Sequence, residues 1–166
     1  QLGVIKDYQV ARLTGFLDPT ADTRTTNYNR NQAEIAVGSG GVLGRGYGSG
    51  TQTNLDFVPE QHTDFIFTVA GEEFGFVGSA IFLSLYAILL WRAIRIAYLS
   101  KDPFGTYLAT GVASMFAIQM FVNVGMVIGI MPITGIPLPF VSYGGSQMLA
   151  NFIAIGILMN VHMRRF

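Results

Sequence analysis

Apolar residues dominate three long stretches of this chain, and a long polar stretch precedes them. The apolar stretches cover residues 64–98, 104–131 and 144–163, and each reaches the roughly 17–25 residues that a helix needs to cross a bilayer. No charged residue lies between Phe104 and Val161. The pattern predicts an all-α polytopic membrane protein with three transmembrane helices.

The last two apolar stretches are separated by a segment that cannot continue a helix. The sequence "MPITGIPLPFVSYGG" contains three prolines and three glycines, which break helical hydrogen bonding. We expect a loop at residues 132–143. Irregular backbone at membrane depth persists only where protein or a water-filled cavity covers it, so the hydroxyls of Thr134, Ser142, Tyr143 and Ser146 are candidates to line such a cavity.

Residues 1–63 are rich in Gly, Thr, Asn, Asp and Arg, and they predict a large loop outside the membrane. Within it, residues 28–37 have a modest amphipathic pattern and residues 38–50 are glycine-rich. The chain starts with Gln and has no signal-peptide pattern. We therefore expect a C-terminal fragment of a longer protein, whose first residues are the possible end of a preceding span.

Composition supports a membrane protein and narrows its chemistry. The chain is 51% hydrophobic and 12% charged, against roughly 25% charged residues in typical soluble domains. Ten basic and ten acidic residues cancel, so the charge gives no sign of a nucleic-acid partner. With no cysteine and two histidines, a disulfide framework or a Cys/His metal site is excluded, and any metal would need oxygen ligands.

The basic residues near the apolar stretches predict an orientation. They lie at 92–101, between the first two spans, and at 164–166, after the third. Because short cytoplasmic loops are enriched in Lys and Arg, we place loop 99–103 and tail 164–166 in the cytoplasm. Residues 1–63 and loop 132–143 then share the extracytoplasmic face.

Asp64 is the leading candidate for chemistry. A carboxylate at the mouth of a span is half removed from water, where burial disfavours its charge and a nearby cation favours it. The alternative is that Thr63 or Asp64 only caps the helix that follows. His62, two residues earlier, is either an interfacial polar residue or part of the same site.

Glu72 and Glu73 lie about 12 Å further along the same predicted helix, at 1.5 Å per residue. Ionisable residues at that depth indicate either function or an ion pair between helices. Small-residue spacing of Gly71, Gly75 and Gly78 indicates close packing of this helix against another.

Other polar positions have simpler explanations. Gln119 and Asn123 are four residues apart on the second span and favour interhelical hydrogen bonding, while Gly125 and Gly129 form a G-x-x-x-G packing pair. The glycine-rich residues 38–50 match no phosphate-binding pattern. They predict a flexible surface loop in which Arg45 is the one residue able to reach a phosphate.

Four motifs, in order, resemble the SEDS family of cell-wall polymerases. They are "DYQVARLTGFLDP", "IAVGSGGVLGRGYGSGTQ", "VPEQHTDFIFTVAGEEFGFVG" and "FVNVGMVIGIMPITGIPLPFVSYGGS", and together they cover nearly the whole chain. The resemblance implies about ten spans in the complete protein, with Asp64 as the essential aspartate. Further motif positions, which the resemblance assigns to substrate binding, are Arg12, Arg45, Glu60, His62, Thr134, Ser142 and Ser146.

The implied activity is peptidoglycan glycosyl transfer on lipid II, a disaccharide-peptide carried by undecaprenyl diphosphate, during cell elongation in the bacterial cytoplasmic membrane. Asp64 would be the general base of an inverting transfer. Arg12, Arg45 and Lys6, or a divalent cation such as Mg²⁺ or Mn²⁺, would stabilise the leaving diphosphate. The implied partners are a class B penicillin-binding transpeptidase and other membrane proteins of the elongation complex.

Two other functions fit parts of the pattern. Intramembrane acids and a broken helix are also typical of transporters, here a flippase for lipid-linked precursors. A non-catalytic scaffold of the elongation complex, binding its partners through helix faces, is the third interpretation.

Overall fold

The computed structural model describes residues 24–50 and 63–164 of the chain. Helix α2 spans Arg24–Ser39, α4 spans Ile66–Tyr98, α5 spans Pro103–Val127 and α6 spans Gly145–Met163. The latter three are long and apolar enough to cross a membrane. The predicted all-helical fold with three membrane-spanning helices is therefore confirmed.

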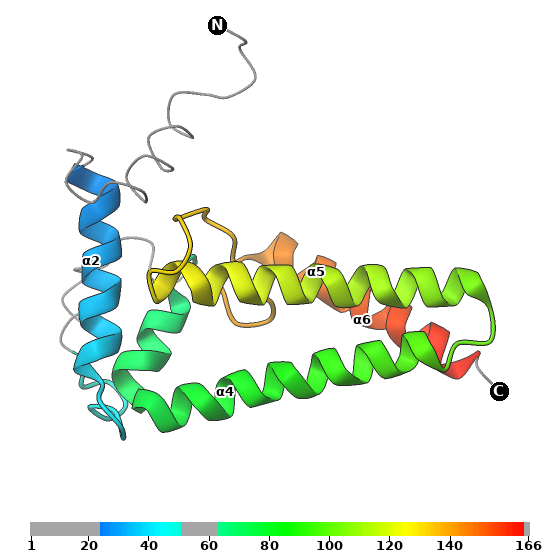
Figure 1. The fold of residues 1–166 in the computed structure, drawn as a ribbon, viewed down its shortest axis with the longest axis horizontal. Coiled ribbons are helices and arrows are strands. Elements are labelled where there is room, and N and C mark those ends of the chain that lie inside the picture. The colour runs from blue at the N-terminus through cyan, green and yellow to red at the C-terminus, as the bar shows by residue number, and fades with distance from the viewer. Residues whose placement is uncertain (1–23, 51–62, 165–166) are drawn as a thin grey trace, which may run out of the picture.

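The three long helices form a bundle, and α2 closes one end of it. α5 packs against both α4 and α6, and α2 lies across the bundle's end, where it contacts the first part of α4 (Figure 1). α2 includes residues 28–37, where the sequence pattern is amphipathic. Because it runs across the spans rather than along them, α2 acts as a cover for this end.

Small side chains hold the middle of the bundle together. A buried cluster joins α4, α5 and α6, and five of its eight buried members are alanine. Alanine lets helix backbones approach closely, which replaces the hydrophobic driving force that is weak between helices in lipid. A second buried cluster lies at the α2 end and joins α2, α4 and α5. Its members are Ala33, Phe65, Phe67, Met126 and Val127.

Helix α4 is broken at Gly75, where the backbone has φ 63° and ψ −160°. That conformation is open to glycine and strained for other residues. The first part of α4 turns away from the bundle axis and runs beside α2, and the second part continues along α5 (Figure 1). Gly71 confirms the predicted close packing, since a Cβ there would lie 2.9 Å from Val37 of α2.

The glycine-rich residues 38–50 pack onto this break and satisfy its open carbonyls. The Arg45 amide donates to the Glu72 carbonyl at 3.1 Å, and the Gly46 amide donates to the Glu73 carbonyl at 3.0 Å. These carbonyls lie at the end of the first part of α4, where the break removes the amides that would otherwise bond to them within the helix. The predicted surface position is confirmed, since Leu43 and Tyr47 are 81% and 86% exposed, but the backbone is hydrogen-bonded to α4.

The other side of the break is satisfied in the same way. The Phe76 amide donates to the Gly41 carbonyl at 2.9 Å, and the Val77 amide donates to the Val42 carbonyl at 3.1 Å. Residues 38–50 thus supply both donors and acceptors. Unpaired backbone groups cost several kcal/mol in an apolar environment, so this loop allows the helix to bend.

The break changes the predicted place of the two glutamates. A continuous helix would carry Glu72 and Glu73 two turns into the membrane, but the first part of α4 runs across the bundle end instead (Figure 1). The Glu73 carboxylate Oε1 accepts the Gly48 amide at 3.0 Å. Glu73 therefore anchors residues 38–50.

Helix α5 ends earlier than the apolar run suggested. It stops at Val127, and the amides of Ile130 and Met131 turn back to the Gly125 carbonyl at 2.8 and 3.0 Å. Gly129 lies beyond the helix with φ 76°. The predicted G-x-x-x-G helix-packing pair is therefore wrong, because Gly125 abuts Met131 of its own connecting segment and Gly129 turns the chain.

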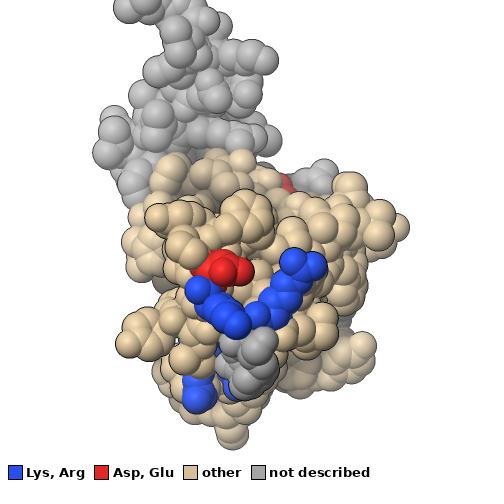
Figure 2. All heavy atoms as spheres, turned by 90° about the vertical axis from the view of Figure 1, so that its right-hand side faces the viewer, with Lys and Arg blue, Asp and Glu red and all other residues tan. Residues whose placement is uncertain are grey.

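Basic side chains gather at the end of the bundle opposite α2 (Figure 2). Arg92, Arg95, Lys101 and Arg164 are all exposed there, and the Arg95 guanidinium lies 5.6 Å from the centre of the Trp91 ring. This is the distribution that the positive-inside rule associates with a cytoplasmic face. The orientation itself stays a prediction.

Replacing Gly44 with alanine tests the docking of residues 38–50 on α4. Gly44 has φ +79°, and a Cβ there would lie 2.1 Å from the Glu73 carbonyl oxygen. The strained backbone and the clash together cost about 2–4 kcal/mol, so the apparent Tm of the detergent-solubilised full-length protein should fall by several degrees. Gly38→Ala is the matched control, because nothing lies within 4 Å of its Cβ position. Equal melting of the two variants would contradict the docked arrangement.

Candidate functional site

Asp64 lies in the turn that leads into α4, and its side chain is half-buried. The N-cap of α4 is Phe65, whose side chain makes no capping hydrogen bond. Neither Thr63 nor Asp64 therefore holds the capping position. Asp64 stands one residue before the N-cap position.

The backbone of Asp64 is held by a buried amide on α5. The Nδ2 of Asn123 donates to the Asp64 carbonyl at 2.8 Å and to the Ile136 carbonyl at 2.8 Å. Asn123 is 0% exposed. One side chain thus links three segments: the turn before α4, helix α5, and the Pro/Gly loop at residues 132–143.

The Asp64 carboxylate lies against that loop. A Cβ built on Gly135 would be 3.1 Å from Asp64 Oδ2, and Gly135 has φ +72°. The positive φ favours glycine at this position, because L side chains rarely adopt this backbone, and a Cβ would also make a tight contact with the carboxylate. The loop backbone at Gly135 therefore lies close to the carboxylate.

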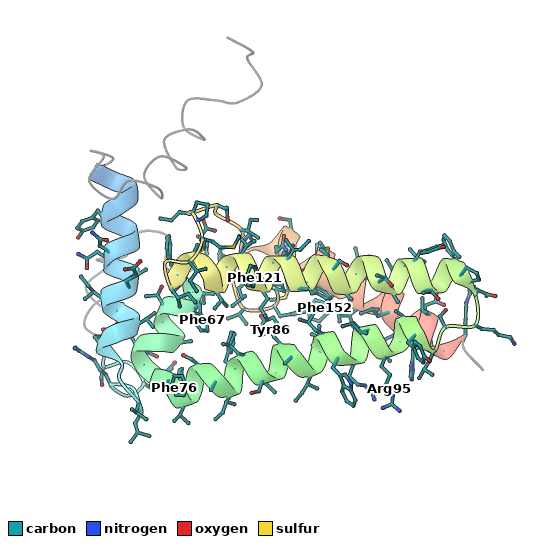
Figure 3. All side chains as sticks on the ribbon, viewed as in Figure 1. Phe67, Phe76, Tyr86, Arg95, Phe121 and Phe152 are labelled. Carbon is teal, nitrogen blue, oxygen red and sulfur yellow. The ribbon has the colours of Figure 1, made fainter. Side chains whose placement is uncertain are left out.

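The rest of the loop is fixed by contacts with the bundle. Tyr86 points from α4 toward α5 (Figure 3), and its hydroxyl donates to the Pro139 carbonyl. The Leu138 amide donates to Ser142 Oγ at 2.8 Å. Phe140 packs on α5 and α6 through its ring. Its ring centre is 5.4 Å from that of Phe116 and 5.9 Å from that of Phe152.

The candidate substrate-binding residues of this loop have different surroundings. Thr134 and Ser146 are exposed, and Thr134 directly precedes the glycine that touches Asp64. Ser142 is 4% exposed and its oxygen accepts the Leu138 amide. This geometry gives Ser142 a part in holding the loop.

Arg45 is not brought beside Asp64. Its backbone pairs with Glu72, at the far end of the first part of α4, and its exposed side chain donates from Nε to the Ser39 carbonyl at 3.2 Å. Asp64 and Glu72 are separated by about 12 Å of helix at 1.5 Å per residue. The four remaining candidates lie outside the described residues: Lys6, Arg12, Glu60 and His62.

The described residues do not assemble a metal centre. Among them, no group of three or more His, Asp or Glu side chains is close enough to hold an ion. Hard divalent cations such as Mg²⁺ need several oxygen ligands. The described side chains alone therefore do not supply a complete set of ligands for a divalent cation.

An apolar groove of about 630 Å³ lies beside the break in α4. Its walls come from the glycine-rich residues 38–50, from α4 and from α5, and they include Phe67, Phe76 and Val124. Val124 directly follows Asn123. The groove is of a size that ligands occupy in proteins, and its apolar walls suit a hydrocarbon chain.

The sequence did not reveal how two side chains, Asn123 and Tyr86, position the site. It predicted an interhelical hydrogen bond from Asn123, and the structure shows hydrogen bonds to the Asp64 and Ile136 carbonyls. Tyr86 was not singled out at all, although it is 6% exposed and anchors the Pro/Gly loop. A tyrosine in the middle of an apolar helix was the available signal, because its hydroxyl needs a partner when buried.

Comparisons with known proteins agree on one family. The model of the FtsW, RodA and SpoVE family of cell cycle proteins matches residues 2–165. The chain is 45% identical over 162 residues to the peptidoglycan glycosyltransferase MrdB of Escherichia coli K12, covering 98% of this chain and 44% of MrdB. It is 44% identical over 154 residues to the stage V sporulation protein E of Bacillus subtilis, covering 93% of this chain and 42% of that protein.

Solved structures show the same fold. A peptidoglycan synthase complex that coordinates polymerization and crosslinking contains a chain with TM-score 0.79 and 33% identity, over 98% of this chain and 44% of that one. The rod shape determining protein RodA of Thermus thermophilus, crystallised as an aspartate-to-alanine mutant, gives TM-score 0.60 and 39% identity, over 64% of this chain and 36% of that one.

The sequence spans less than half the length of these curated relatives. Within that span, the family match covers nearly every residue, and the helices superimpose on solved members. This chain belongs to the FtsW, RodA and SpoVE family of cell cycle proteins.

Proposed function

We propose that this chain is the C-terminal part of a peptidoglycan glycosyltransferase that polymerises lipid II into glycan strands, with Asp64 as general base. The observation that carries the proposal is a half-buried carboxylate that lies beside the Pro/Gly loop at Gly135, on a backbone that Asn123 holds to that loop. It is supported by 45% identity to a protein named peptidoglycan glycosyltransferase.

The reaction needs a base because a sugar hydroxyl is a weak nucleophile. The 4-hydroxyl oxygen of one sugar forms a bond to the anomeric carbon of another, and the bond from that carbon to the lipid diphosphate breaks. The hydroxyl proton passes to the Asp64 carboxylate, and the electron pair leaves with the diphosphate. Attack opposite the leaving group inverts the anomeric centre. A positioned base of this kind typically contributes 10²–10⁴-fold.

The leaving diphosphate needs positive charge as the bond breaks. Arg12 and Lys6 are the candidates from the sequence, and Arg45 is exposed near the break in α4. Its distance from Asp64 along α4 suits a contact with the diphosphate and not with the nucleophile. The nearby apolar groove of about 630 Å³ supports a substrate with a hydrocarbon tail.

The proposed location is the bacterial cytoplasmic membrane, with the site on the extracytoplasmic face. The basic end of the bundle, opposite α2, supports this orientation. We propose a role in cell elongation beside a class B penicillin-binding transpeptidase and other membrane proteins of the elongation complex. Similarity to a rod shape determining protein, and to a complex that coordinates polymerization and crosslinking, supports that role.

Asp64→Asn in the full-length protein tests the base. The amide keeps the size of the side chain but accepts no proton at neutral pH, so polymerisation of purified lipid II should fall by about 10²-fold or more. Asp102→Asn is the matched control, because Asp102 is exposed at the opposite end and its side chain makes no capping bond among the described residues. Full glycan synthesis by a folded Asp64→Asn protein would rule out the proposed base. Lipid II translocation without glycan growth in the wild type would favour a flippase.

Gly135→Ala tests the closeness of the Pro/Gly loop to the carboxylate. The added methyl would lie 3.1 Å from Asp64 Oδ2 on a backbone with φ +72°, so it must displace either the loop or the carboxylate. We expect a loss of kcat of about 10-fold or more, because small misplacements of catalytic groups are costly. Gly156→Ala on α6, with nothing within 4 Å, should keep wild-type kcat. Unchanged kcat in Gly135→Ala would show that the loop does not constrain Asp64.

A further inference from the structure

We infer that Asn123 is a positioning residue that sets where the Asp64 carboxylate stands relative to the Pro/Gly loop. The inference rests on the proposed function, because it assigns a part in catalysis to a residue that acts through Asp64. It starts from one nitrogen atom, Nδ2 of Asn123, which is 2.8 Å from the carbonyl oxygens of both Asp64 and Ile136.

A primary amide is suited to this double contact. Its NH₂ group has two hydrogens, so it can donate to two carbonyls at once. Asn123 uses both donors, and among the described residues its Oδ1 accepts no hydrogen bond. Leaving that oxygen buried and unpaired has a cost. The arrangement therefore favours the two carbonyl contacts over full satisfaction of the side chain.

The two carbonyls belong to segments on either side of the carboxylate. One is the carbonyl of Asp64 itself, and the other follows Gly135, whose α-carbon faces Asp64 Oδ2. Sharing a nitrogen keeps the two oxygens within twice the hydrogen-bond length of each other. Asn123 therefore fixes the separation between the base and the loop in front of it.

The position of Asn123 makes this link rigid. The residue is 0% exposed near the end of α5, and the following residues Met126 and Val127 are also 0% exposed, in the core shared with α2 and α4. A side chain on a packed helix has few rotamers available, which is the condition for holding a catalytic group within a fraction of an ångström. Displacement of about 1 Å can reduce a rate by 10².

The alternative is that Asn123 only stabilises the fold. Asn151 provides the comparison, because it is also a buried amide, 1% exposed, on a membrane-spanning helix. Its Oδ1 accepts the Gln147 Nε2 at 3.4 Å, within the same helix. The two residues are matched in chemistry and burial, but Asn123 alone of the two bonds to the backbone of Asp64.

The test compares Asn123→Leu with Asn151→Leu in the full-length protein, using purified lipid II. Leucine keeps the branch at Cγ, is somewhat larger, and removes both donors. We expect Asn123→Leu to lower kcat by about 10–100-fold with KM for lipid II within about threefold of wild type. Asn151→Leu should keep kcat within about twofold. A purely structural role would lower the amount and Tm of folded enzyme and leave the kcat of the folded fraction unchanged, which would overturn the inference.

A double variant shows whether Asn123 acts through Asp64. If it does, Asn123→Leu combined with Asp64→Asn should polymerise lipid II no more slowly than Asp64→Asn alone, because the base is already lost. Multiplied losses in the double variant would overturn the inference. Should Asn123→Leu fail to fold, Asn123→Ser replaces it, since its single hydroxyl can donate to one carbonyl; wild-type kcat in that variant would also overturn the inference.

The proposed function and this inference fail in different ways. Full activity of Asp64→Asn removes the base and with it the proposed function. Loss of activity in Asp64→Asn together with wild-type kcat in Asn123→Leu leaves the proposed function standing and removes only the positioning role.

Discussion

Backbone groups that leave a helix in an apolar environment must find new partners, and this constraint shapes the described part of the chain. At Gly75 the first part of α4 ends and the second begins, so carbonyls open on one side and amides on the other. Backbone amides and carbonyls of residues 38–50 form hydrogen bonds with these carbonyls and amides of α4. Without that loop the bend would leave several polar groups unpaired, and a straight α4 would carry Asp64 away from α5.

The bend explains how the candidate site is formed. The first part of α4 crosses the end of the bundle, so the turn that holds Asp64 arrives beside Asn123 on α5 and beside the Pro/Gly loop. The loop is in turn anchored by Tyr86 from the second part of α4. Both parts of the broken helix therefore contribute to one site. Most of these contacts reach backbone atoms, so they define positions more strongly than they restrict side-chain identity.

Polar side chains are exposed at one end of the bundle and buried at the other. At the basic end, Arg92, Arg95, Lys101 and Arg164 are exposed to the surroundings. At the α2 end, Glu73, Asn123 and Ser142 are buried and hydrogen-bonded to backbone groups. Buried polar groups are costly unless paired, and here each pair holds an irregular segment in place. One of these segments, the Pro/Gly loop, lies against Asp64, and the other, residues 38–50, lies at the break in α4.

Hydrophobic length and proline and glycine content were sufficient to predict three membrane helices and the loop at 132–143, because these depend on local composition. The choice of Asp64 over a simple helix cap came from the motif resemblance and not from local patterning. The bend at Gly75, the docking of residues 38–50 and the separation of Arg45 from Asp64 were not predictable in this way. Glycine permits a left-handed backbone, but the sequence alone does not show whether another segment supplies hydrogen-bond partners for the carbonyls and amides exposed at the break. Likewise, Asn123 was visible as a hydrogen-bonding residue, and only the packing of α4, α5 and the loop decided that its partners are the Asp64 and Ile136 carbonyls. Local chemistry determined which elements form, and long-range satisfaction of backbone polarity decided how they meet.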